Sequence, residues 1–109
     1  MATAYKTLGQ VIPSATTNTD LYTVPSSTST VASTLSICNQ GATNATVNVA
    51  IRVAGASITT KQYLLYTMPI NAYQSIFMTL GITLATTDVV TVYASTANVS
   101  FNLFGSEIS

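Results

Sequence analysis

The chain of 109 residues has no histidine, no tryptophan and one cysteine, Cys38. The lack of histidine removes the commonest general base, the commonest metal ligand and the usual partner of a nucleophilic serine or cysteine. A single cysteine allows neither an internal disulfide nor a cysteine-based metal cluster. We therefore expect a protein that is not an enzyme and holds no cofactor and no metal, with no catalytic residue to assign.

Charge is the second scarcity, because charged residues make up 6% of the chain against about 25% in a typical protein. The net charge is zero, from Lys6, Arg52, Lys61, Asp20, Asp88 and Glu107. Three scattered cations cannot displace counterions from phosphates, which argues against nucleic acid or an anionic membrane surface as a partner. Small soluble domains usually rely on net charge to resist self-association, so its absence indicates a chain that packs against other chains.

Long apolar runs are missing as well. No stretch approaches the roughly 20 residues of a membrane helix, and the opening MATAYKTLGQ lacks the apolar centre of a secretory signal. We expect synthesis in a cytoplasm. The chain is nevertheless 48% hydrophobic and long enough to bury a core. We expect one domain over residues 1–109, with residues 1–10 available as an extended N-terminal arm.

What the sequence contains is strand-like alternation. Because side chains alternate between the faces of a strand, apolar residues at every second position indicate a strand with one buried face. The pattern occurs in TSTVASTLSICN (28–39), TVNVAIRV (46–53), IFMTLGITL (76–84), DVVTVYAS (88–95) and ANVSFNLFG (97–105). In the first segment we expect Val31, Leu35 and Ile37 to share one face with Ser33. In the third, Phe77 falls on the face opposite Ile76.

Turn-forming residues separate these segments, and further strands are expected near residues 4–12 and 20–25. A helix competes with a strand only over residues 51–68, where Gly55 and β-branched residues favour the strand. NQGATN (39–44) is expected to be a hairpin loop in which Gly41 takes a positive φ. About eight strands at this spacing predict an all-β fold, a single antiparallel β-sandwich. Jelly-roll and plainer Greek-key topologies both remain open.

The candidate interaction surface combines aromatic and cationic side chains: Tyr63, Tyr66, Tyr73, Arg52 and Lys61. Exposed tyrosines of this kind bind sugar rings or another protein, and partly buried strand tyrosines with solvated hydroxyls are the alternative. The cations, with Lys6, are available to acidic groups of a partner. This predicts a surface for recognition, not for catalysis.

The remaining polar candidates have simpler expected roles. Asp20 and Asp88 each precede a strand and are expected to cap turns through their own backbone. Glu107 is expected to be solvated or to contact a neighbouring chain. The cation nearest to Cys38 in sequence is Arg52, in the next expected strand and available to lie opposite it. Cys38 is nevertheless expected to be a small, unreactive strand residue.

Three segments, TTNTDLYTVP (16–25), STVASTLSICNQG (29–41) and LGITLATTDVVTVYASTANVSFNLFGSEI (80–108), resemble small virion proteins of tailed bacteriophages, including phages of cyanobacteria. The shared pattern is a Leu-Tyr-Thr-Val-Pro strand, a strand that ends at Asn before a glycine-containing loop, and a late DVVTVYAS…VSFNLFG hairpin. The chain departs from the pattern at VPSSTST, where many relatives have a glycine in the turn.

The resemblance implies a structural component of the virion, such as a capsid decoration or cement protein or a neck or tail accessory protein. Its expected partners are itself, as a homo-oligomer with the trimer as the expected state, and other virion proteins. The alternative is a tail-fibre, baseplate or adhesion module that contacts host-surface glycans through residues 63–73 or links a fibre to the particle. Both hypotheses place the protein in the virion.

Overall fold

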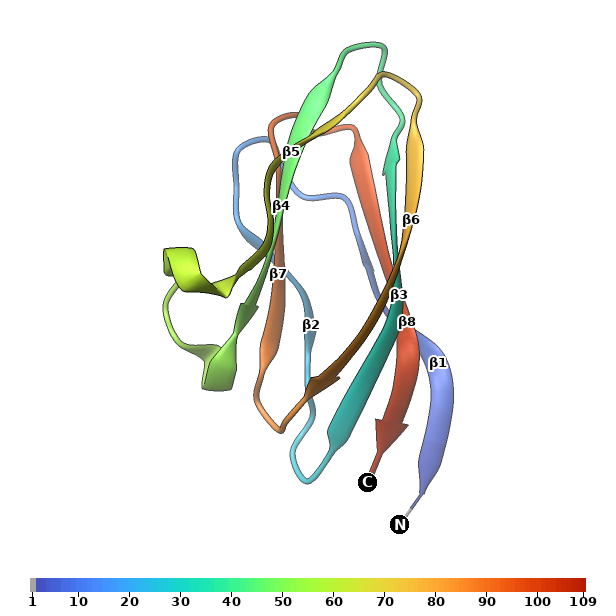
Figure 1. Cartoon of the computed structure of the whole chain (residues 1–109), viewed down its shortest axis with the longest axis vertical. Helices are drawn as coiled ribbons and strands as arrows, with labels where there is room; N and C mark the ends of the chain where they lie inside the picture. The colour runs from blue at the N-terminus through green and yellow to red at the C-terminus, as the bar shows by residue number, and fades with distance from the viewer. Residues whose placement is uncertain (1) are drawn as a thin grey trace.

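Eight β-strands form two four-stranded antiparallel sheets that face each other in a computed structural model, which describes residues 2–109 (Figure 1). The strands are β1 (Thr3–Val11), β2 (Thr19–Thr23), β3 (Ser29–Asn39), β4 (Ala45–Arg52), β5 (Tyr63–Ile70), β6 (Ser75–Leu84), β7 (Val89–Ala94) and β8 (Val99–Ile108). Two 3-10 turns, η1 (Val53–Gly55) and η2 (Thr60–Gln62), lie between β4 and β5. The predicted antiparallel β-sandwich of about eight strands is confirmed.

The strand order decides the topology. It is β1-β8-β3-β6 in one sheet and β2-β7-β4-β5 in the other. The chain therefore forms one long hairpin, in which β1 pairs with β8, β2 with β7, β3 with β6 and β4 with β5. The hairpin is rolled up so that β3 also pairs with β8 and β4 also pairs with β7. These two further pairs complete the two four-stranded sheets. The result is a jelly roll.

Most connections cross between the sheets, which corrects two expected hairpins. Residues 40–44 lead from β3 to β4 in the opposite sheet, and β7 and β8 also lie in different sheets. Gly41 does not take the expected positive φ. A Cβ at Gly41 would lie 2.9 Å from the side-chain nitrogen Nδ2 of Asn98, so glycine permits the side chain of Asn98 to lie against this loop. Residues 51–68 contain the end of β4, both 3-10 turns and most of β5.

The core lies between the two sheets, where the inward rows of side chains meet. Its largest fully buried side chains include Phe101, Leu35, Ile37 and Leu103 from one sheet and Val47, Val49, Val92 and Ile70 from the other. Full burial of one such side chain contributes about 1.5–3 kcal/mol. In β8 the alternation of buried and half-buried residues from Val99 to Leu103 follows the predicted period.

A line of bulges crosses the β1-β8-β3-β6 sheet. The register shifts between Thr7 and Gly9 in β1 and between Ala32 and Thr34 in β3. The extra residue reverses the faces of β3, so Ala32 is buried and Val31 is only half-buried. The expectation that Val31 shares the face of Leu35 is therefore wrong, because sequence alternation assumes a strand without a bulge.

The N-terminal segment, expected to be available as an arm, is paired with β8 along β1. Figure 1 shows both chain ends at the same end of the sandwich. The backbones of Ala2 and Ser109 exchange two hydrogen bonds, each 2.8 Å long. Both termini are thus tied into one sheet.

Candidate interaction surface

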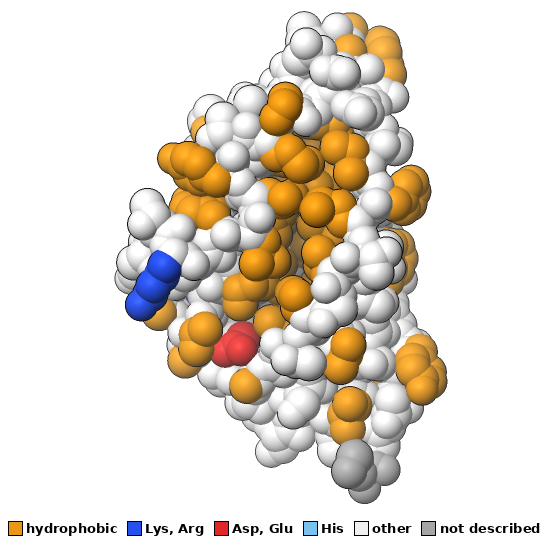
Figure 2. Space-filling model, viewed as in Figure 1, with side chains coloured by type: hydrophobic (Ala, Val, Ile, Leu, Met, Phe, Trp, Pro, Cys, Tyr) orange, Lys and Arg blue, Asp and Glu red, His pale blue; other side chains and the backbone are white. Residues whose placement is uncertain are grey.

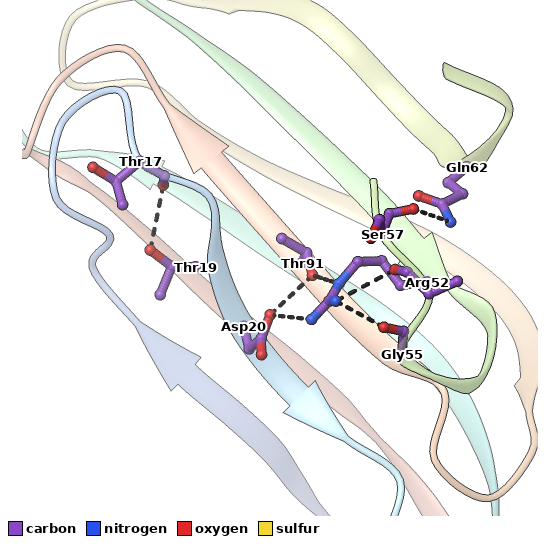
Figure 3. A network of polar contacts seen from close by, with 9 residues as sticks. Thr17, Thr19, Asp20, Arg52, Gly55, Ser57, Gln62 and Thr91 are labelled. Atoms are coloured by element: carbon purple, nitrogen blue, oxygen red, sulfur yellow. Dashed lines mark hydrogen bonds and ion pairs between the residues drawn. The ribbon is translucent and has the colours of Figure 1, made fainter. Parts of the chain in front are cut away.

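Arg52 lies on the outer face of β4 and binds groups of its own chain (Figure 3). Its Nη2 donates to Asp20 Oδ1 at 2.8 Å, and its Nε donates to Thr91 Oγ1 at 3.0 Å. Its Nη1 donates to the carbonyl oxygens of Gly55 and Ala56. Thr91 in turn donates to the same oxygen of Asp20. Asp20 therefore joins β2 to β4 across β7, which corrects the expected turn-capping role.

Glu107 is also held within the chain, against the expectation of a solvated or intermolecular carboxylate. It accepts a hydrogen bond from Lys6 Nζ at 2.9 Å and one from the Tyr22 hydroxyl at 2.5 Å. Tyr22 comes from the opposite sheet, and its oxygen lies 2.8 Å from Thr30 Oγ1. The hydrogen bonds from Tyr22 and Lys6 lower the pKa of Glu107 below its ordinary value. This cluster connects the two sheets near the chain ends.

Asp88 fulfils its predicted role, with one addition. Its Oδ2 accepts from the backbone nitrogen of Ala85, which closes the turn before β7, and its Oδ1 accepts from the backbone nitrogen of Ala54 in η1. Asp88 is also buried. All three carboxylates therefore have intramolecular partners, and within residues 2–109 only Lys61 among the cations has no ion-pair or hydrogen-bond partner. The surface offered to a partner is almost neutral.

The three candidate tyrosines do not form one group. Tyr63 and Tyr66 lie together on β5, with ring centroids 4.8 Å apart and planes inclined at 60°. With Thr60 they line a shallow pocket of about 330 Å3, beside Lys61 of η2. Tyr73 lies beyond the opposite end of β5, in the turn before β6, and is 72% exposed. The pair Tyr63–Tyr66 is therefore the part of the predicted group that can act together.

Cys38 lies half-buried on β3. Its sulfur accepts a hydrogen bond of 3.4 Å from the hydroxyl of Ser75 on the neighbouring β6. Arg52 lies on the other sheet. Residues 2–109 contain no group of three or more His, Cys, Asp or Glu side chains that could hold a metal ion. Nor does any helix within that range have the length and apolar character needed to cross a membrane.

A column of hydrophobic side chains lies along one side of the sandwich, hollowed between ridges of other atoms (Figure 2). The two edge strands β5 and β6 border this side, which we call the open flank (residues 63–70 and 75–84). Its half-buried residues that pack against the core are Leu65, Met68, Ile76, Met78, Leu80 and Ile82. Neither strand contains a charged residue. The core thus reaches the surface along an uncharged flank.

Comparison with known proteins adds a fold-level similarity. A scan against protein-family models finds no match, and neither does a search of curated proteins. Among solved structures, the chain is similar to a pentameric capsid protein isolated from metagenomic phage sequences, with 18% identity and a TM-score of 0.42. The match covers 96% of this chain and 59% of that protein, so the chain spans little more than half of its length.

The sequence interpretation missed the most exposed apolar residues of the strands. Phe77 on β6 is 73% exposed and Tyr5 on β1 is 85% exposed. Tyr5 borders a shallow groove of about 630 Å3 on the outer face of its sheet, together with Val31 and Phe104. A signal was present for Phe77, because it falls among Thr and Gly on the outward row of its strand. A single exposed aromatic residue is common on protein surfaces, so Phe77 gains meaning only from the uncharged sheet edge on which it lies.

Proposed function

We propose that the chain is a structural subunit of a tailed-phage virion and acts through contacts between folded subunits. The observation that carries the proposal is the open flank, an uncharged strip of half-buried core side chains between two sheet edges. A monomer in water gains nothing from such a surface, and exposed edges invite pairing. In an assembly the flank is covered, and no ion has to be desolvated to cover it.

The internal use of charge supports the same role. Asp20, Glu107, Arg52 and Lys6 are paired inside the chain, so a subunit contact that leaves Lys61 in solvent buries no unpaired charge. Serine and threonine supply hydrogen-bonding groups at lower desolvation cost than ions. Jelly rolls also occur in viral capsid proteins, an analogy at the level of fold. Together with the resemblance of residues 16–25, 29–41 and 80–108, these features favour a decoration, cement, neck or tail accessory protein.

The test is a mass measurement of the purified full chain by light scattering across a dilution series, followed by sedimentation with particles that lack the protein. We expect a closed homo-oligomer that persists to low micromolar concentration and binds the particles. The trimer stays the prediction from sequence for its size. A chain that is monomeric at high micromolar concentration and does not bind particles contradicts the proposal.

An adhesion module is the second candidate, favoured by the pocket at Tyr63, Tyr66 and Thr60. Two inclined aromatic rings beside a threonine hydroxyl offer a stacking surface and a hydrogen bond to a neutral sugar. This function predicts binding of host-surface glycans that Tyr66→Ala abolishes, with the fold intact by circular dichroism. Tyr73→Ala is the matched control, because Tyr73 lies outside the pocket. Equal loss in both variants contradicts a pocket-based site.

A further inference from the structure

Strand β6 is the least protected of the four edge strands in the described part of the chain. Natural edge strands resist pairing by charges, proline, bulges or shortness. The other three have such features: Lys6 in β1, Asp20 in the five-residue β2, and Pro69 in β5. β6 is ten residues long and has neither charge nor proline. Its register against β3 shifts between residues 79 and 82, beside Gly81 with its positive φ, and is regular over residues 75–79. This half of β6 is a flat edge with unpaired backbone groups.

The open flank is large enough for a stable contact. The accessible area of 5550 Å2 over 109 residues is a mean of about 51 Å2 per residue, so the 18 residues of β5 and β6 present roughly 900 Å2. Their exposure is at least average, because nine are exposed, seven half-buried and two buried. A standard-size interface uses roughly 800 Å2 of each partner. The exposed residues lie mainly on the outward rows of two different sheets, so the flank reaches this size only together with the outer-face residues beside its edges.

Its charge pattern indicates what covers it. A strip without charge complements another uncharged strip, whereas an acidic or basic partner would lose its hydration without gaining an ion pair. A second copy of this chain presents the same strip. A contact that uses the same patch on both copies is a two-fold contact, the commonest symmetry among homo-oligomers.

Resting on the proposed assembly role, we propose that two copies pair antiparallel through residues 75–79 of β6 across a two-fold axis. The β1-β8-β3-β6 sheets of the two copies then form one eight-stranded sheet. The outward Phe77 of each copy packs against the outer face of the other. The inward Ile76 and Met78 of each copy cover the open flank of its partner. One contact thus buries the unpaired edge, the exposed aromatic ring and the half-buried apolar row.

The test compares the full chain with Thr79→Lys, which places a charge on the outward row of β6. In the pair, residue 79 of each copy lies opposite Ser75 of the other, so the change places one lysine at each end of the joined edge. Charges on an edge strand oppose strand pairing, and we expect dimerisation to weaken by roughly tenfold. The matched control is Thr7→Lys, an exposed threonine on the opposite edge strand of the same sheet. Mass is measured by light scattering across dilution. Amide hydrogen exchange of residues 75–79 in the unaltered chain gives a second readout that needs no variant.

The expected result is a dimer or other even-numbered oligomer, in place of the trimer predicted from sequence, weakened by Thr79→Lys and unchanged by Thr7→Lys. Amides of residues 75–79 should exchange more slowly at high than at low protein concentration. A trimer or pentamer that Thr79→Lys leaves intact, with exchange in β6 independent of concentration, overturns the two-fold contact and leaves the proposed function standing. A monomer overturns the contact, and a monomer without affinity for particles overturns the proposed function as well.

Discussion

The hydroxyl of Tyr22 is the most informative single group to remove, because it joins the two sheets. It donates to Glu107 Oε2 at 2.5 Å and lies 2.8 Å from Thr30 Oγ1. Glu107 also accepts from Lys6 at 2.9 Å. Tyr22→Phe keeps the ring in the core and removes only the oxygen, so the change in stability reports the hydrogen bonds alone.

The size of the effect follows from the partners. A hydrogen bond to a charged group contributes about 1.5–3 kcal/mol, and a buried hydroxyl that loses its partner adds about 1 kcal/mol or more. Thr30 is 1% exposed, so water does not replace the lost partner. We expect Tyr22→Phe to lower the free energy of unfolding by about 2–3 kcal/mol. For 109 residues, an unfolding entropy of about 2.1 cal/mol/K per residue converts this loss to a melting temperature lower by about 9–13 °C.

The assay is urea and thermal unfolding followed by circular dichroism, at one fixed protein concentration because assembly adds to apparent stability. Thr30→Val is the companion variant. The double variant Tyr22→Phe/Thr30→Val should lose less than the sum of the two single losses, because it leaves no unpaired hydroxyl between them. A loss below about 0.5 kcal/mol for Tyr22→Phe would refute the argument that this cluster stabilises the sandwich.

The same hydroxyl predicts an alkaline transition. Burial and the hydrogen bond to Glu107 raise the pKa of Tyr22 to about 12 from an ordinary value of 10.0. A pKa that is higher in the folded state gives stability that is present below pH 10 and is lost as the pH rises from 10 to 12. Tyr22→Phe should remove this part of the alkaline loss. An unchanged alkaline profile in the variant would show that Tyr22 does not titrate with unfolding.

Three further predictions concern other contacts. Because the pKa of Glu107 is lowered in the fold, its stabilisation is present above an ordinary pKa of 4.5 and lost as the pH falls through the lower folded value. Urea midpoints should therefore fall less on acidification in Glu107→Gln than in the unaltered chain. Arg52→Ala should lower the free energy of unfolding in urea by about 1–2 kcal/mol, since it removes four hydrogen bonds. Lys61→Ala, the control, should change it by less than about 0.5 kcal/mol. Equal changes in the two variants would contradict the internal role of Arg52. A Cβ at Gly105 would lie 2.1 Å from the Val31 carbonyl oxygen, so Gly105→Ala should lower the melting temperature far more than Gly81→Ala. Gly81 has open space around it, and alanine there loses about 1–2 kcal/mol of stability because of the positive φ. The reverse order of melting temperatures would contradict the close packing of β8 against β3.

The sequence alone determined the class of fold and much of the core. Period-two alternation is local, so it identifies strands without knowledge of their partners. Val47, Val49, Phe101 and Leu103 are buried where the alternation places them. The scarcity of charge can also be read directly from the sequence, and it indicates a chain that packs against other chains. The contact between Tyr63 and Tyr66 does not follow from this alternation, which places residues three apart on opposite faces; the register of β5 against β4 shifts along this stretch.

Only the tertiary structure decided the rest, because these features depend on residues far apart in the chain. The jelly roll follows from pairs such as β1 with β8, which no local pattern encodes. The bulge at Ser33 exists because Gly105 lets two backbones approach, and it moves Val31 out of the core. The sequence predicts a turn-capping role for Asp20 and a surface role for Glu107. In the fold, Asp20 instead binds Arg52, and Glu107 binds Tyr22. The open flank is likewise a property of two sheet edges side by side, since each strand by itself reads as an ordinary half-buried strand.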